Sequence, residues 1–287
     1  MRFLRKNIFR TRSDLFLNCA LYIVTRELVR SCMHKFFTEP HNINEMEGKI
    51  LGDDVKHIYK VLRLSEGEEV VLNNCEGIEY LGEIKAITKS EVIVSIIKKL
   101  DINNESKVSV HLFQGLPKGQ KMDLIVQKGT ELGIVEFIPT ITARVDVKLK
   151  GEFKKLDRLN RIALEASKQS KRSIVPQVKE VIDFNEALKE LKEMDLVIIP
   201  YENAEDFGIK SLVNHLNKEN IELDSIKDVG ILIGPEGGFE EDEINILKEQ
   251  GAYIVTLGNR ILRTETAGFT ATALIQYELG DLGGKLL

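Results

Sequence analysis

The sequence predicts an α/β domain with a mainly parallel sheet, preceded by a small β-rich domain. From residue 108 onward, apolar runs typical of strands alternate with stretches typical of helices, and this alternation favours a parallel sheet flanked by helices. Residues 34–100 instead contain short runs rich in Val and Ile, separated by turn clusters. The polar residues 101–107 divide the two regions as a linker, and 287 residues are enough for both domains.

Composition is ordinary for a soluble globular protein, with 43% hydrophobic and 30% charged residues. Cys19, Cys32 and Cys75 have neither zinc-ligand spacing nor the density of a disulfide scaffold, which favours a reducing compartment such as the cytoplasm. The five histidines are scattered, so we expect no metal site. Nothing in the composition suggests a membrane protein.

Charge is unevenly distributed along the chain. The net charge is −5, yet residues 113–172 hold thirteen Lys/Arg and seven Asp/Glu. A local basic surface on an acidic protein suits a polyanionic partner that is met at one face. The alternative is a solvated helix face without a partner.

Residues 1–32 do not look like part of a fold. They carry seven Lys/Arg and two Asp/Glu in total, and a basic head, residues 2–12, is followed by an apolar stretch, residues 15–24, that is too short to span a bilayer. The segment loosely resembles a signal or transit peptide. The favoured interpretation is that Met33 is the true start, because the orderly domain pattern begins immediately after it.

In the β-rich region, residues 67–72, 79–87 and 91–97 are predicted strands, which suggests a compact barrel. Residues 53–61 are a predicted helix, with Asp53 placed to cap its start. Lys60 and Arg63 lie on or beside this helix and are candidate phosphate contacts, although a solvated face explains them equally well.

The α/β region is predicted to alternate regularly. Its expected strands are residues 108–113, 135–139, 196–199, 231–233 and 253–257, and its expected helices are 120–132, 153–171, 185–192, 241–250 and 268–279. Gly251 follows one of these helices, where a C-terminal glycine belongs.

Two polar loops follow neighbouring predicted strands, residues 234–239 and residues 260–267. Open α/β sheets bind ligands outside the carboxyl ends of their strands, so we expect the two loops to lie side by side over one pocket. The first loop has three glycines in five residues, which lets backbone N–H groups approach a ligand closely. It lacks the Lys-Ser/Thr of a P-loop and the spacing of a dinucleotide motif, so by itself it is also compatible with a structural turn.

Seven motifs are spread between Met33 and the C-terminus: Phe36-Phe37, HIYKVLR at residues 57–63, LPKG at 116–119, KGTELG at 128–133, QSKR at 169–172, IGPEGG at 233–238 and LGNRILRTETA at 257–267. In these motifs the chain resembles the RsmE family of bacterial 16S ribosomal RNA (uracil N3) methyltransferases, within the SPOUT superfamily of S-adenosylmethionine-dependent enzymes. Residues 1–32 depart from the family pattern.

The resemblance implies a PUA-like β-barrel over residues 33–100 that helps to grip RNA, and a SPOUT methyltransferase domain over residues 108–287 with a C-terminal trefoil knot. Knots are among the rarest topologies, so this feature rests on the resemblance alone. It also implies a homodimer whose active site borrows residues from the partner subunit, and 16S ribosomal RNA or the small ribosomal subunit as substrate.

S-adenosylmethionine needs backbone groups for its adenine and room for its methionyl tail. Glycine-rich and strand-end backbone can supply both, and a third strand-end loop at Pro200 and Tyr201 can close the pocket. The expected donor-binding residues are Pro200, Tyr201, Gly234, Pro235, Glu236, Gly237, Gly238, Leu257, Gly258, Ile261, Leu262 and Ala267.

Uridine N3 is a poor nucleophile until it is deprotonated, and a nearby cation stabilises the developing anion. We expect Arg263 and Arg172 to position RNA or stabilise this anion, and Glu265 to orient an arginine or accept the proton. Alternatively, Arg263 and Glu265 merely pair to hold the loop. N3 lies on the pairing edge of the base, so the target must be unpaired or extruded. The expected RNA contacts are Lys60, Arg63, Lys118, Lys121, Lys128, Lys168 and Arg172.

Three other functions compete with this hypothesis. A ribose 2′-O methyltransferase of the same superfamily would share the glycine-rich loop at residues 234–239. The sequence of residues 260–267 and the predicted β-barrel over residues 33–100 favour the N3 enzyme. An RNA-binding assembly factor without catalysis is opposed by the intact Arg263 and Glu265. A nucleotide hydrolase is disfavoured because the P-loop lysine is absent.

Overall fold

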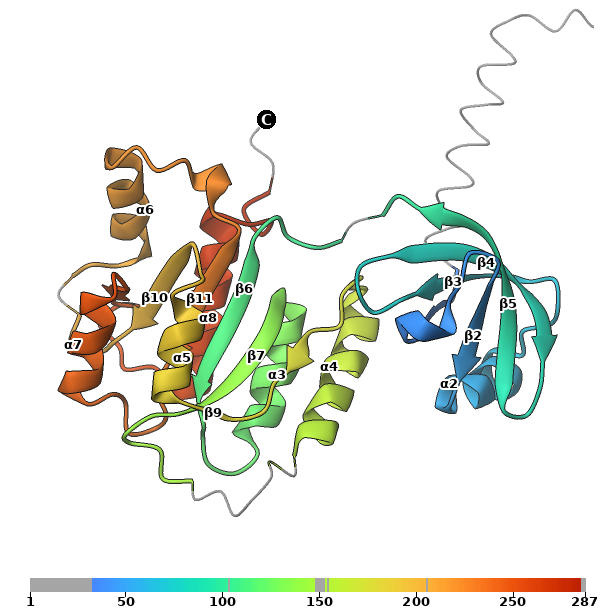
Figure 1. Ribbon diagram of the computed structural model, residues 1–287, viewed down its shortest axis with the longest axis horizontal. Helices are drawn as coiled ribbons and strands as arrows, with labels where there is room; N and C mark the ends of the chain where they lie inside the picture. The colour runs from blue at the N-terminus through green and yellow to red at the C-terminus, as the bar shows by residue number, and fades with distance from the viewer. Residues whose placement is uncertain (1–32, 103, 148–152, 154, 205, 285–287) are drawn as a thin grey trace, which may run out of the picture. The chain divides into compact units, whose positions relative to one another are not determined.

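The computed structural model describes residues 33–284 except 103, 148–152, 154 and 205 (Figure 1). The interpretation of residues 1–32 therefore lies outside the described residues. The chain forms two compact units, the first ending at Asp101 and the second running from Ile102 and including Cys75–Gly77. In the described part of the chain, no helix has the length and apolar character needed to cross a membrane, and no group of three His, Cys, Asp or Glu side chains could hold a metal ion.

The first unit is built on a five-stranded sheet in the order β1-β3-β4-β5-β2. The β1–β3 pair is parallel, and the remaining pairs are antiparallel. Register shifts in the β4–β5 pair, between Leu81 and Gly82 and between Ile84 and Ala86, bend the sheet, which is strongly curved in Figure 1. The strands are β1 (Lys35–Phe37), β2 (Glu47–Leu51), β3 (Glu69–Asn73), β4 (Glu79–Ile87) and β5 (Glu91–Leu100).

Strands β1 and β2 were not predicted, because three to five residues are too few for a clear alternation pattern. Side chains of both nevertheless enter the core of this unit, where Phe36 and Ile50 pack with Leu72. A short 3-10 helix, η1 (Pro40–Asn42), connects them.

The expected helix at residues 53–61 is a short α-helix, α2 (Asp53–Lys56), that continues as a π-helical turn, η2 (His57–Leu62). Gly52, not Asp53, occupies the N-cap position, so the predicted cap was wrong. Asp53 lies in the first turn, where a carboxylate interacts favourably with the positive end of the helix dipole. Lys60 and Arg63 are exposed on this segment, and their RNA contact stays a prediction.

The second unit contains a parallel sheet in the order β12-β10-β11-β6-β7-β8, with β9 also paired to β7. The parallel α/β class is thus confirmed. The strands are β6 (Ser109–Gly115), β7 (Ile134–Ile141), β8 (Gln177–Val178), β9 (Ile182–Asp183), β10 (Leu196–Pro200), β11 (Asp228–Ile233) and β12 (Tyr253–Val255).

Helices cover both faces of this sheet. On one face, α3, α4, α6 and α8 contribute to a core with Leu112 and Ile231; on the other, α5 and α7 pack around Phe113 and Leu232. The helices are α3 (Lys121–Glu131), α4 (Leu156–Ser170), α5 (Phe184–Leu191), α6 (Ile209–Lys218), α7 (Glu241–Glu249) and α8 (Thr264–Glu278), with a 3-10 turn η3 (Leu223–Ser225) before β11.

Two helix predictions needed correction. Helix α6 was missed, although Ile209, Leu212 and Leu216 are buried at helical spacing. Helix α8 begins at Thr264, four residues before the expected start at Gly268. The carbonyl of Arg263 accepts the Ala267 N–H at 2.8 Å, so the second half of the expected 260–267 loop is the first helical turn.

Strand order sets the position of the polar loops. Strand β10 lies between β11 and β12, so the segments that follow these three strands leave the sheet at adjacent points on its carboxyl edge. The threading of a knot stays an expectation from the resemblance.

Candidate functional site

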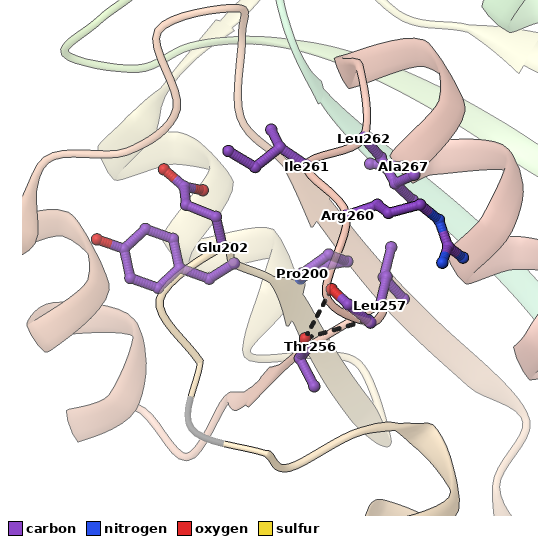
Figure 2. A pocket seen from close by; sticks show the side chains of 10 residues that line it. Pro200, Glu202, Thr256, Leu257, Arg260, Ile261, Leu262 and Ala267 are labelled. Atoms are coloured by element: carbon purple, nitrogen blue, oxygen red, sulfur yellow. Dashed lines mark hydrogen bonds between the residues drawn. The ribbon is translucent and has the colours of Figure 1, made fainter.

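Two adjoining pockets lie at the carboxyl edge of β10, β11 and β12. The smaller, of about 80 Å³, is lined by the segments after β10 and β12 (Figure 2). The larger, of about 440 Å³, is also lined by residues 234–239, called here the glycine loop, and by the start of α8. It has the volume of a small-molecule site. Both pockets share Pro200, Glu202, Ile261, Leu262 and Ala267.

All residues expected to bind the methyl donor line one pocket or the other. Figure 2 shows Pro200 and Leu257 lining the smaller pocket, with the side chains of Arg260 and Glu202 extending in opposite directions. Ile261 is 88% exposed and lines both pockets. The expected donor-binding residues that line the smaller pocket are Pro200, Tyr201, Leu257, Gly258, Ile261, Leu262 and Ala267. Those that line only the larger pocket are Gly234, Pro235, Glu236, Gly237 and Gly238.

The glycine loop needs its glycines for close approach. Gly238 has a φ of 69°, in the left-handed region, and a Cβ there would lie 3.1 Å from Glu202 Oε1. A Cβ on Gly237 would lie 3.0 Å from the Cβ of Arg144. Side chains at these positions would therefore be strained or crowd the loop's neighbours.

A buried polar contact fixes the glycine loop to α8 and β6. The Thr264 hydroxyl donates to the Gly234 carbonyl at 2.6 Å and accepts from Gln114 Nε2 at 2.8 Å. Gly115, the last residue of β6, lies so close to the glycine loop that a Cβ at this position would be 2.5 Å from Pro235 N. Sequence reasoning missed Gln114 and Thr264; a glutamine at the end of an apolar strand was the available signal.

Arg144, which follows β7, supports the other side of the loop and was also missed. Its Nε and Nη2 donate to the two oxygens of Glu240 at 2.8 and 3.0 Å, and its Nη1 donates to the Gly237 carbonyl at 3.0 Å. The hydrogen bond that Arg144 donates to Glu240 raises the pKa of Arg144 above its ordinary value. A bidentate pair of this kind holds the loop in one geometry.

Three charged side chains meet at the wall of the larger pocket. The Lys121 Nζ lies 2.9 Å from Glu236 Oε1 and 3.5 Å from Glu265 Oε2. Burial would raise the pKa of Glu236, but hydrogen bonds from Lys121 and from backbone N–H groups, including that of Lys118, hold it below its ordinary value. The hydrogen bond to Glu236 raises the pKa of Lys121. Both groups are therefore ionised at neutral pH.

Arg263 and Glu265 occupy different environments. Arg263 is exposed, lines the larger pocket and is the N-cap residue of α8. Glu265 is only 8% exposed, and its ion partner is Lys121. Among the residues described, the Arg263 guanidinium forms no ion pair, so the alternative that Arg263 and Glu265 pair to hold the loop was wrong.

Arg172 is placed differently from our expectation. It is 4% exposed, and its guanidinium donates to Glu105 Oε2 at 3.0 and 2.6 Å and to the carbonyls of Thr130 and Ile134. These contacts engage the guanidinium inside the second unit, and Arg172 lines neither pocket. We therefore correct its expected role from RNA or base contact to a structural one.

The expected RNA-contacting lysines of the second unit are not all in one place. Lys118 and Lys121 are adjacent to the glycine loop, and Lys118 pairs with Asp146 at 2.6 Å. Lys128, on α3, pairs with Glu131, and Lys168, on α4, pairs with Glu165. Only the first two are adjacent to the pockets.

Comparison with known proteins identifies the class of this molecule. A family model described as an RNA methyltransferase domain matches residues 104–276, and an RNA methyltransferase PUA domain model matches residues 50–97. The parallel sheet with a glycine-lined pocket at its carboxyl edge is thus that of an RNA methyltransferase. The chain belongs to the ribosomal RNA small subunit methyltransferase E family.

The relatives match more than four fifths of this chain. The Bacillus subtilis protein of that name is 38% identical over 82% of this chain and 91% of its own length, and the Aquifex aeolicus protein is 31% identical over 85% and 99%. A Neisseria gonorrhoeae ribosomal RNA small subunit methyltransferase E, solved bound to S-adenosylmethionine, is 31% identical with a TM-score of 0.71, covering 87% of this chain and 99% of that one. A Legionella pneumophila protein solved with the same cofactor is 29% identical with a TM-score of 0.72, over the same shares.

Proposed function

We propose that this chain transfers the methyl group of S-adenosylmethionine to N3 of a specific uridine in 16S ribosomal RNA of the small subunit. The observation that carries the proposal is the pair of adjoining pockets built by the family's two most specific motifs, residues 233–238 and 257–267. The choice of uracil N3 rests on the family resemblance.

The pocket walls fit the methyl donor. Pro200, Leu257 and Leu262 offer an apolar lining, and Gly258, with a φ of 103°, turns the backbone at the pocket wall. The larger pocket adds the carboxylates of Glu202 and Glu236, which suit the ammonium group of the methionyl tail. We infer that the smaller pocket holds adenine and that residues 234–238 hold the tail.

S-adenosylmethionine, when bound, supplies a methyl group already activated on a sulfonium. The chain must therefore place the acceptor nitrogen in line with that methyl and lower the cost of removing its proton. Uracil N3 releases its proton to water and donates its electron pair to the methyl carbon, while the electrons of the carbon–sulfur bond remain with sulfur. Arg263 lines the larger pocket at the start of α8, where the helix dipole adds positive potential, and stabilises the negative charge that spreads over N3 and the adjacent carbonyl oxygens.

The partners are proposed from the same resemblance. We infer a cytoplasmic homodimer that acts on 16S ribosomal RNA or the small subunit, with Lys60 and Arg63 of the first unit and Lys118 of the second as phosphate contacts. The target base must be extruded from any pairing before N3 can enter the pocket.

One experiment tests the proposed function directly. Small subunits from a strain lacking the gene are incubated with the purified protein and S-adenosylmethionine, and the nucleosides of 16S ribosomal RNA are analysed by mass spectrometry. We expect one new N3-methyluridine. A 2′-O-methylated nucleoside would instead favour the ribose enzyme, and donor binding without transfer would favour a non-catalytic assembly factor.

A further inference from the structure

We propose that Lys121 is a second cation that contacts the target uracil in the larger pocket, beside Arg263. We also propose that Glu265 is a positioning residue that acts through Lys121. This inference rests on the proposed function and assigns to Lys121 the role that the sequence suggested for Arg172.

The position of Lys121 is set by three segments. It is the first residue of α3, and its ammonium reaches Glu236 of the glycine loop and Glu265 in the first turn of α8. Its side chain is 31% exposed and lines the larger pocket together with Arg263. Two carboxylates from separate segments therefore hold one cation at the pocket wall.

Glu265 has no other ion partner in the described part of the chain. Its Oε2 is buried and makes no hydrogen bond, and Lys121 Nζ, 3.5 Å away, is the nearby counter-charge. A buried carboxylate without such a charge is costly, so the attraction keeps Lys121 in place. Glu265 lines neither pocket, which suits a residue that acts through its neighbour.

The Lys121 ammonium has N–H donors that the contact to Glu236 does not use. An ammonium carries three N–H groups, and the short contact to Glu236 uses one of them. The pKa of Lys121 is raised, mainly by that contact, so the group stays protonated and does not serve as the base. It can therefore donate a hydrogen bond to a uracil carbonyl oxygen next to N3 as negative charge develops there.

A phosphate contact, our earlier expectation for Lys121, fits this geometry less well. Phosphate contacts are made by side chains that extend from the surface, as Lys118 does, with a side chain 60% exposed. Lys121 is instead held by carboxylates against a pocket. The charged groups around it are Glu236, Glu265, Lys118 and the pocket-lining Arg263 and Glu202.

The test compares Lys121→Met, Lys121→Arg and a matched control, Lys189→Met, in which an exposed lysine of α5 is replaced. Each full-length protein is assayed for S-adenosylmethionine affinity, melting temperature, and kcat and KM with small subunits as substrate. For Lys121→Met we expect kcat to fall on the order of 100-fold, as when one donor to a developing anion is removed. We expect affinity for the donor and KM to stay close to those of the unchanged protein, and the melting temperature to fall, because the buried Glu265 carboxylate loses its counter-charge.

Two further readouts separate catalysis from structure. The kcat deficit of Lys121→Met should shrink as pH rises, because uridine N3 then loses its proton without help. Lys121→Arg should restore most of the activity, and Glu265→Gln should lower kcat while sparing donor affinity.

Other outcomes overturn the proposal. Unchanged kcat in Lys121→Met removes the residue from the reaction. Weaker donor binding, without a pH-dependent deficit in kcat, would make Lys121 a structural support of the loop. A raised KM with unchanged kcat would make it a phosphate contact. Absence of transfer by the unchanged protein would instead refute the proposed function itself.

Discussion

Arg263, Glu265 and Arg172 show how far a residue's role follows from its type. All three carry charges in family motifs, yet Arg263 is exposed at the pocket, Glu265 is buried beside Lys121, and Arg172 is enclosed by Glu105 and backbone carbonyls. The residue types predicted a charged site. Their neighbours, which come from distant segments, decide which charge faces the pocket.

Replacing Arg263 by Ala tests its proposed role at the acceptor. We expect methyl transfer to fall on the order of 100-fold or more, because a cation that stabilises the uracil anion is lost. Donor affinity and melting temperature should be preserved, since the side chain is exposed and forms no ion pair with the described residues. Transfer and donor binding are measured separately, and unchanged turnover would exclude Arg263 from the mechanism.

Replacing Gly115 by Ala tests the close contact beneath the glycine loop. The added Cβ would lie 2.5 Å from Pro235 N and 2.8 Å from the Gly234 carbonyl carbon, so backbone must move. We expect a stability loss of about 1–3 kcal/mol, typical of overpacking, and weaker donor binding. In the control Gly208→Ala the new Cβ would meet Thr256 O at an ordinary 3.5 Å. Equal donor affinity of the two variants, measured by calorimetry, would contradict this reading.

At the scale of elements, the second sheet is tied at both ends by polar contacts. At the carboxyl ends of its strands, Gln114 and Thr264 anchor the glycine loop. Near the beginnings of β6, β7 and β11, His111 lies between Glu136 Oε2, at 3.1 Å from Nδ1, and Asp228 Oδ1, at 3.2 Å from Nε2. Lys179 also pairs with Glu136, at 3.1 Å.

The His111 cluster predicts a pH dependence of stability. Burial lowers the pKa of His111, but hydrogen bonds with Glu136 and Asp228 outweigh it and raise the pKa above 6.5, its ordinary value. A raised folded-state pKa means that the contribution is complete below the unfolded value and is lost as pH rises through the folded one. His111→Gln should therefore destabilise the protein more below pH 6.5 than in alkaline solution.

Chemical denaturation at several pH values measures this difference. The control is His41→Gln, whose imidazole is 71% exposed beside Glu39. A destabilisation by His111→Gln that does not change with pH would show that the cluster contributes packing and not charge.

For the whole molecule, the prediction concerns RNA binding. Because phosphate contacts release counterions, affinity for 16S ribosomal RNA should fall about tenfold or more between about 50 and about 200 mM salt. Replacing the exposed Lys118 by Gln should weaken binding and reduce the slope of log affinity against log salt by about 1. Salt-independent affinity, measured by filter binding, would count against a basic binding surface.

The sequence by itself determined the α/β class, the β-rich front region, the two ligand loops and the family, because periodicity, glycine placement and motif spacing are local properties. The sequence also predicted that the two loops lie together, because loops at the carboxyl ends of strands in one parallel sheet share an edge of that sheet. It did not place the start of α8, whose first turn is stabilised by Thr264 contacts to Gly234 and Gln114.

Only the tertiary structure decided the partner of each charge. Arg144 and Glu240 are 96 residues apart, and Arg172 and Glu105 are 67 apart, so no local pattern links them. Burial and pairing depend on which distant segments pack together, and they determine whether a cation faces a ligand or the protein interior. For this reason Arg172 was misassigned from the sequence, and Lys121 emerged at the pocket only when Glu236 and Glu265 were seen beside it.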